Sequence, residues 1–240
     1  MTGTHRITGG IIAAGEGSRL RAEGWRVSKP MVPVLGRPLI EHALSRFRAA
    51  GIRKLSIIIN ETSDDCGRWL RDQAGDLDID LVVRTTPSSY ASFRIVADRL
   101  AGAPAIITTV DSILPEDDFV GFVAAAADFS RDAVVLGLTD HVDDDNPLWA
   151  NLDSRDGRIR RLGADHGSHV TAGLYVLPAR RPADPPAGFA RLRDYLSWLV
   201  SEGYPVYGRV LPRTFDIDRG HDIAAAERMI SGKKRTSNTL

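Results

Sequence analysis

The chain has 240 residues, of which 43% are hydrophobic and 26% are charged, and its formal net charge is zero. This balance is ordinary for a soluble globular protein, and it gives no overall field that would draw the chain to nucleic acid or lipid. The single cysteine, Cys66, excludes an internal disulfide and a cysteine-rich zinc site. No apolar stretch approaches the roughly 20 residues of a membrane span, and the N-terminus has no signal-peptide core. We therefore expect a cytoplasmic protein that binds neither nucleic acid nor a membrane.

The first half of the chain alternates apolar, β-rich runs with amphipathic helical patterns. Strands are predicted at residues 10–14, 54–60, 79–85 and 104–110. Helices are predicted at residues 38–50, 64–73 and 89–100, and a further helix is led by Pro115. Continuous apolar strands separated by helices indicate a parallel sheet covered on both faces. The expected fold class is α/β, with a doubly wound, mostly parallel sheet.

The second half consists of strand-like segments separated by turns. These segments are residues 133–138, 148–153, 158–163 and 169–177. They predict a small antiparallel extension, with a hairpin turn at Asp156-Gly157. A loop at 183–188, a helix at 189–202, a strand at 204–211 and a helix at 220–230 follow. We expect one domain over residues 1–231 and a polar tail over residues 232–240.

A glycine loop follows the first predicted strand and reads Gly15-Glu16-Gly17-Ser18-Arg19-Leu20. It lacks the Gly-Lys-Ser/Thr of a Walker loop and the third glycine of a dinucleotide fingerprint. Glycines let backbone N–H groups approach a triphosphate closely. Arg19 offers a fixed fork of donors to phosphate oxygens, and Lys29 is a compact charge suited to phosphate. On charge patterning alone, a solvated surface role for both cations is the less favoured alternative.

Three aspartates are candidate metal ligands. Asp111 follows a buried strand, where ligands sit in parallel sheets, and its carboxylate suits Mg²⁺. It could equally cap the helix that follows. Asp216 and Asp218 flank Ile217, so in an extended segment both carboxylates lie on one face. Asp218 could also cap the last helix.

Four motifs in order resemble the nucleotidyltransferases, which comprise nucleoside-diphosphate-sugar pyrophosphorylases and related cytidylyltransferases. "AAGEGSRL" and "SKPMVPVLGRPLIEH" are similar to that family's AAGxGxRL and PKPLLPVxGKPLI signature. "TTVDSI" resembles its strand-end metal aspartate, "VTAGLYVL" its NAGIYV strand, and "FDIDRGHDIAAAE" its WxDIxTPEDLxxAE ending. The resemblance spans residues 10–228. It implies a GT-A-like fold and Mg²⁺-dependent transfer of a nucleoside monophosphate from an NTP to a phosphorylated acceptor, with pyrophosphate release.

The resemblance also implies a role for each matching residue. The catalytic cations would be Arg19 and Lys29, and the metal ligands Asp111, Asp216 and Asp218. The nucleotide would be bound by Ala13, Ala14, Gly15, Glu16, Gly17, Ser88 and Ser89. The acceptor would contact Thr171 and Gly173. His166 and His169, just before the "VTAGLYVL" strand, could line the acceptor pocket or lie equally well at the surface. Because the family's Glu-Lys-Pro before the NAGIYV strand is missing, the acceptor is open between a sugar-1-phosphate and a small alcohol phosphate or phosphonate. A homo-oligomer is also left open.

Two other functions are weighed against this one. A catalytically idle nucleotide-binding regulator would be favoured by loss of the lysine or the acids, which are all present. A nucleotide-sugar-dependent glycosyltransferase usually carries Asp-x-Asp, where this chain has Val110-Asp111-Ser112. The acidic cluster at 140–147 is interpreted as a solvated loop, and Trp69 and Trp198 as core residues.

Overall fold

A computed structural model describes residues 7–73, 75–126, 128–142, 146–182, 185 and 188–232. Three aspartates of the acidic cluster, at positions 143–145, lie outside the described residues. Most of the predicted loop at 183–188 and residues 233–240 of the predicted tail lie outside them as well. The last helix, α7 (Gly220–Gly232), extends two residues beyond its predicted end.

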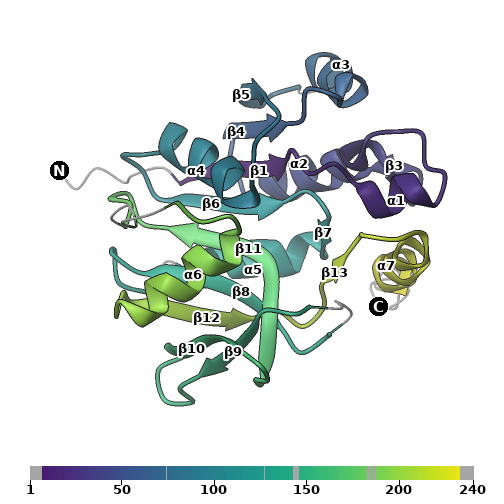
Figure 1. Cartoon of the computed structure of the whole chain (residues 1–240). Coiled ribbons are helices and arrows are strands. Elements are labelled where there is room, and N and C mark those ends of the chain that lie inside the picture. Colours follow the sequence, from purple (N-terminus) through teal and green to yellow (C-terminus); the bar gives the residue numbers. More distant parts are fainter. Residues whose placement is uncertain are drawn as a thin grey trace, which may run out of the picture.

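A nine-stranded sheet forms the centre of the molecule (Figure 1). Its first half is parallel, in the order β6, β1, β4, β5, as the apolar runs predict. The strands are β1 (Thr8–Ala13), β4 (Lys54–Ile59), β5 (Asp78–Val83) and β6 (Ala105–Thr109). Every crossover in this half places a helix between parallel strands, and all carboxyl ends therefore meet at one edge.

The antiparallel part is organised around one long strand, β11 (His169–Leu177). It pairs antiparallel with β6, β8 (Val134–Thr139) and β9 (Trp149–Leu152). The β9–β10 hairpin, whose second strand is β10 (Ile159–Ala164), contains the predicted turn, with Gly157 at φ 74°. The last strand of the sheet, β12 (Val206–Val210), runs parallel to β8. The sheet is thus mostly parallel with a small antiparallel part, as expected.

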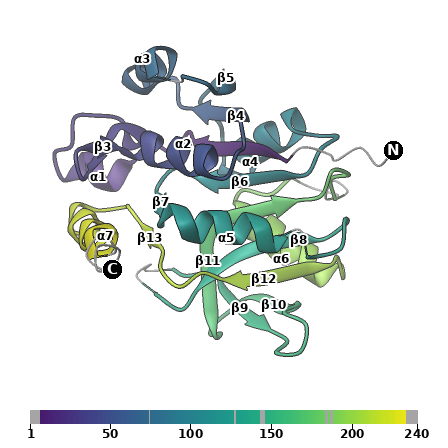
Figure 2. The same ribbon diagram turned by 180° about the vertical axis from the view of Figure 1, so that it is seen from behind.

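Helices cover both faces of the sheet. One face carries α4 (Ser89–Arg99) and α6 (Leu192–Ser201), which lie in front in Figure 1. The other carries α2 (Leu39–Ala49) and α5 (Glu116–Ala126), in front in Figure 2. Each layer has its own apolar core, in which Phe47 and Phe119 pack edge to face at 5.2 Å on one side and Phe93 and Tyr195 meet on the other. Trp69 and Trp198 are partly buried against these cores.

Short elements complete the fold and frame the carboxyl edge of the sheet. Those that follow β1 are α1 (Ser18–Ala22), the 3₁₀ helix η1 (Lys29–Met31), β2 (Pro33–Val34) and β3 (Arg37–Pro38). The others are α3 (Asp64–Gln73), β7 (Ser112–Ile113) and β13 (Phe215–Asp216). Helix α6 begins at Leu192, three residues later than the helical pattern predicts. Strand β13 pairs with β7, and this contact brings the end of the chain back to the end of β6.

Candidate active site

The glycine loop lies between β1 and α1 and is shaped around Lys29. Gly17 adopts φ 61°, and a Cβ there would lie 2.9 Å from Cβ of Lys29. A side chain at this position would therefore be strained and would also displace the lysine. Gly15 has open space where its Cβ would be. One glycine thus permits the turn, and the other leaves the loop backbone accessible.

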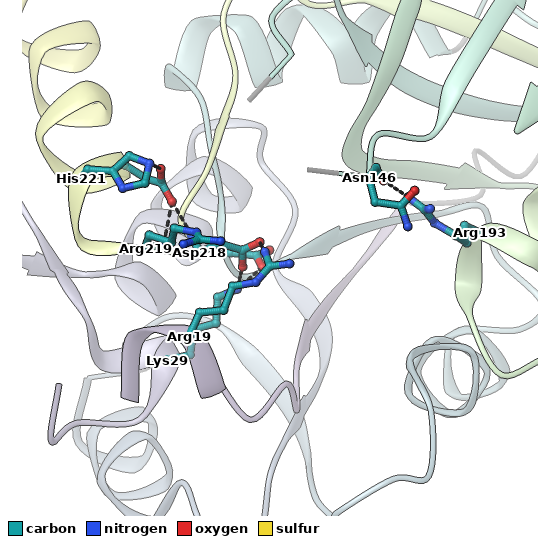
Figure 3. Close-up of polar contacts among 9 residues, drawn as sticks. Arg19, Lys29, Asn146, Arg193, Asp218, Arg219 and His221 are labelled. Atoms are coloured by element: carbon teal, nitrogen blue, oxygen red, sulfur yellow. Dashed lines mark hydrogen bonds and ion pairs between the residues drawn. The ribbon is translucent and has the colours of Figure 1, made fainter. Parts of the chain in front are cut away.

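Lys29 connects two of the predicted metal ligands. Its Nζ donates to Oδ2 of Asp111 at 2.5 Å. It also donates to Oδ1 of Asp218 at 2.6 Å (Figure 3). Arg19 Nη1 donates to the other oxygen of Asp218 at 2.9 Å. The Lys29 side chain is only 10% exposed, against 23% for Asp111 and 40% for Asp218. These four residues form a charge cluster that is shielded at the lysine and open at Asp218.

The charges of the cluster support one another. Burial disfavours the charged ammonium, but the carboxylates of Asp111 and Asp218 outweigh it and raise the pKa of Lys29 above its ordinary value. Burial likewise disfavours the Asp111 carboxylate, but the Lys29 charge and hydrogen bonds from Lys29 and Thr109 lower the pKa of Asp111. Both groups are therefore charged at neutral pH.

Asp218 is held by the start of α7. The buried carboxylate of Asp222 accepts hydrogen bonds from the backbone N–H of Asp218 at 2.8 Å and of Arg219 at 2.6 Å. The backbone N–H of Gly220 donates to Glu23, next to α1, at 2.7 Å. Asp222 thus performs the capping, and the Asp218 side chain is directed to Arg19 and Lys29 rather than to the helix.

Asp111 is held by the neighbouring strands. The Ile217 N–H donates to its carbonyl at 3.1 Å, so β13 runs directly past the end of β6. Ser112 donates its hydroxyl to the carbonyl of Ala172, and the fully buried Arg46 donates to the Ser112 carbonyl at 2.8 Å. The Asp111 side chain therefore points to Lys29 from a fixed backbone and does not cap α5.

Two cavities open on either side of this cluster. The α4 cavity, of about 320 Å³, lies between the glycine loop and the start of α4, and is lined by Ala14, Gly15, Glu16, Lys29, Ser88 and Ser89. The α7 cleft, of about 460 Å³, is lined by Arg19, Thr171, Gly173, Arg193, Asp216 and Asp218. Thr109 and Asp111 line both cavities. The two spaces therefore meet at the Lys29–Asp111 ion pair.

Most of the predicted site residues converge here, with three exceptions. Ala13 is buried in β1 and lines neither cavity, and Gly17 shapes the loop without lining them. His166 lies exposed between β10 and β11, outside both spaces. The β10–β11 turn packs its backbone against β9, since a Cβ on Gly167 would meet the Ala150 carbonyl at 2.8 Å. This packing keeps His166 away from the predicted acceptor position.

Ser88 and Ser89, the predicted nucleotide-binding serines, line the α4 cavity and also have structural partners. Ser88 accepts the Ala91 N–H at 3.1 Å and so caps α4. Ser89 accepts the Leu192 N–H at 3.0 Å and ties α4 to α6. Gly173 adopts φ 67° at an irregularity of β11, where a Cβ would lie 2.5 Å from Oγ1 of Thr109. Its role is close backbone packing beside Asp111.

Several residues of the cavities were not identified from the sequence. Asn60, at the end of β4, donates to the Ala14 carbonyl at 3.1 Å and accepts from Thr85, and so joins the glycine loop to the strand ends. Because Asn60 directly follows a buried strand, its position in the sequence could have identified it as a residue of the carboxyl edge. His141, two residues after the end of β8, and Arg193, on α6, line the α7 cleft, and no local pattern marks them.

The donors fit a hard divalent cation. Asp111 and Asp218 each direct a carboxylate oxygen to one point, the Lys29 ammonium, and Mg²⁺ commonly takes one or two carboxylates together with substrate phosphates. Asp216 lines the same cleft from β13. Within the part of the chain that the structure describes, no three His, Cys, Asp or Glu side chains form a ready-made metal cluster. The arrangement therefore suits a metal that arrives with phosphate oxygens of its own.

Comparison with known proteins identifies the family. The model of the MobA-like NTP transferase domain matches residues 9–175, and the chain belongs to this family. A glucose-1-phosphate thymidylyltransferase of an Actinoplanes species is 35% identical over 116 residues, which cover 47% of this chain and 38% of that protein. The CMP-5'-(3-aminopropyl)phosphonate synthase of Streptomyces rubellomurinus is 30% identical over 181 residues, which cover 70% of this chain and 27% of that protein.

The matches cover well under half the length of these relatives. Among solved structures, the inositol-1-phosphate CTP transferase from T. maritima superimposes with a TM-score of 0.77, at 18% identity, over the full length of both chains. At this identity the likeness shows the fold alone, which is that of a nucleotidyltransferase. No helix within the described ranges is long and apolar enough to cross a membrane.

Proposed function

We propose that the chain catalyses the Mg²⁺-dependent transfer of a nucleoside monophosphate from an NTP to a small phosphorylated acceptor, with release of pyrophosphate. The observation that carries this proposal is the position of the Lys29–Asp111 pair, at the junction of two cavities. A group transfer between two anions needs two binding spaces that meet at a cationic point. The family match and the names of the relatives support the same reaction.

The nucleotide is assigned to the α4 cavity and the acceptor to the α7 cleft. The accessible loop backbone at Gly15 offers N–H groups to the triphosphate. Lys29 and Arg19 neutralise phosphate oxygens and align the attack of an acceptor oxygen on the α-phosphorus. Asp111, with Asp218 and Asp216, would hold Mg²⁺, which supplies further charge neutralisation at the phosphates. The acceptor class is a sugar-1-phosphate, a small alcohol phosphate or a phosphonate.

The first test measures pyrophosphate release for each NTP and dTTP against a panel of phosphorylated acceptors, with Mg²⁺ and with EDTA. Asp111→Asn removes the shared carboxylate, and Asp80→Asn is the matched control, because Asp80 lies on β5 in an exposed pair with Arg99. Release that needs one acceptor and Mg²⁺, and that is lost only in Asp111→Asn, supports the proposal. Nucleotide binding without release favours an idle regulator. Absence of both refutes the proposal.

A further inference from the structure

The wall of the α7 cleft opposite the charge cluster carries a cationic side chain, Arg193. Figure 3 shows Arg193 and Asn146 on one side of the site, and Arg19, Lys29 and Asp218 on the other. Arg193 belongs to the first turn of α6, and Thr139 and His141 line the cleft from β8 and the residues after it. The cleft thus has the charge cluster on one side and the guanidinium group of Arg193 on the other.

Arg193 is held in place, and within the described residues it has no carboxylate partner. Helix α6 is fixed by its buried residues Tyr195, Leu196 and Leu199, and Arg193 Nη2 donates to the Asn146 carbonyl. A guanidinium carries five donors, and this contact uses one nitrogen. No carboxylate among the described residues forms an ion pair with Arg193, whereas Arg19 is paired with Asp218. Within the described residues, the other N–H donors of the Arg193 guanidinium are therefore held in a fixed position and can bind a ligand.

Asp111, Tyr175 and Arg193 line the same cleft, whose volume is about 460 Å³. Burial raises the pKa of the Tyr175 phenol, and the carboxylates of Asp216 and Asp111 raise it further, while the charge of Arg193 acts in the opposite direction. Because Asp111 and Arg193 line one cleft of this size, a small molecule with its phosphate at Asp111 can reach Arg193 with its other end.

From this arrangement we propose that the acceptor carries a second anionic group, a carboxylate, which Arg193 binds at the far end of the α7 cleft. The inference rests on the proposed function and narrows its acceptor class to phosphates or phosphonates that also bear a carboxylate. The planar fork of arginine matches a carboxylate with two parallel hydrogen bonds. An ammonium group at this end would be repelled, and a neutral hydroxyl would leave the charge of Arg193 uncompensated.

The residues around Arg193 agree with this selectivity. Arg193 lines the cleft together with Thr139, His141, Pro147, Leu148, Val170 and Thr171, none of which carries a carboxylate. The His141 ring packs against Phe215 at a tilted angle, with ring centroids 4.4 Å apart, and the His141 backbone N–H donates to the Thr139 hydroxyl. The hydroxyl groups of Thr139 and Thr171 and the imidazole of His141 can hydrogen-bond a carboxylate alongside the Arg193 guanidinium.

The test compares acceptors that differ only in the far group. One set is 3-phosphonopropionate, 3-hydroxypropylphosphonate and 3-aminopropylphosphonate, and a second pair is glucuronic acid 1-phosphate and glucose 1-phosphate. Binding of each is measured by titration calorimetry with nucleotide and Ca²⁺ present, and turnover by pyrophosphate release with Mg²⁺. The variants are Arg193→Met and, as the matched control, Arg191→Met, which removes an exposed arginine at the cap of α6 outside the cleft.

We expect the carboxylate compound of at least one set to bind on the order of 10²-fold more tightly than its neutral partner. Arg193→Met should abolish this preference and raise KM more than it lowers kcat, while Arg191→Met should keep it. Equal binding of carboxylate and neutral partners, a preference for the ammonium compound, no binding of any compound, or an unchanged preference in Arg193→Met overturns the inference. Absence of pyrophosphate release alongside a clear carboxylate preference counts against the proposed reaction and leaves the acceptor assignment standing.

Discussion

Replacing Lys29 by methionine tests whether its ammonium occupies the position of the metal in the absence of nucleotide. The change keeps an unbranched side chain one atom shorter than lysine and removes the cation between Asp111 and Asp218. Loss of one partner of a buried ion pair costs about 3–5 kcal/mol. The Asp218 side chain is 40% exposed and also pairs with Arg19. Loss of the Lys29–Asp218 pair therefore contributes little to the decrease in unfolding free energy. The cost is therefore set by Asp111 and lies near the lower figure, about 3 kcal/mol.

For a chain of this size, that loss corresponds to a decrease in Tm of roughly 6–12 °C. We expect this decrease for Lys29→Met in EDTA, measured by thermal unfolding. Added Mn²⁺ should then stabilise the variant, by about 2.7 kcal/mol at a concentration 100 times its Kd, because a divalent cation replaces the lost charge. The wild-type protein without nucleotide should respond less, because Lys29 competes for the same two carboxylates.

The control for this experiment is Lys54→Met, which removes an exposed lysine at the start of β4. Its unfolding free energy should stay within about 0.5 kcal/mol of wild type. Mn²⁺ binding followed by electron paramagnetic resonance gives an independent readout, and affinity should increase in Lys29→Met only. A Lys29→Met protein as stable as wild type in EDTA, or equal Mn²⁺ stabilisation of both proteins, would refute the reasoning.

Two further predictions concern the packing around the site. Gly51→Ala and Gly173→Ala both place a side chain at positive φ, 72° and 67°, but only position 173 meets a close atom, Oγ1 of Thr109. In urea unfolding, Gly51→Ala should cost about 1–2 kcal/mol and Gly173→Ala about 1–3 kcal/mol more, and equal costs would contradict the packing argument. Burial, helped by the Asp65 charge, raises the pKa of Cys66 to about 12. The stabilisation from the protonated thiol is thus complete below its unfolded pKa of about 8.5 and is lost as the pH rises towards 12. Ellman's reagent at pH 8 should modify the native protein far more slowly than the urea-unfolded protein, and similar rates would show that Cys66 is accessible.

The first half of the fold and the centre of the site are encoded in short stretches of sequence. Apolar runs of strand length, separated by helical spacing, determine β1, β4 and β6, because a strand buried on both faces needs continuous apolar residues. The run of β5 is shorter, and this strand lies at the edge of the sheet with partly exposed residues. The carboxyl ends of these parallel strands then meet at one edge by geometry alone. The glycine loop and Asp111 each follow one of these strands, so the pattern of apolar runs is enough to place them together. The turn at Gly157 was also predictable locally, because an Asp-Gly pair favours a hairpin turn with positive φ.

Only the tertiary structure decided which distant groups complete the site. Asp218 is 189 residues from Lys29, and it arrives because β13 pairs with β7 and Asp222 caps the start of α7. Arg193 enters the cleft because α6 packs on α4, and its place in an ordinary helical pattern gave no warning. Such contacts depend on the fit of whole surfaces and on which loops can close, whereas periodicity reports only whether a residue faces the core. The sequence alone therefore determined the sheet and its phosphate-binding edge, and the packing of elements far apart in the chain determined the charges that face each other across it.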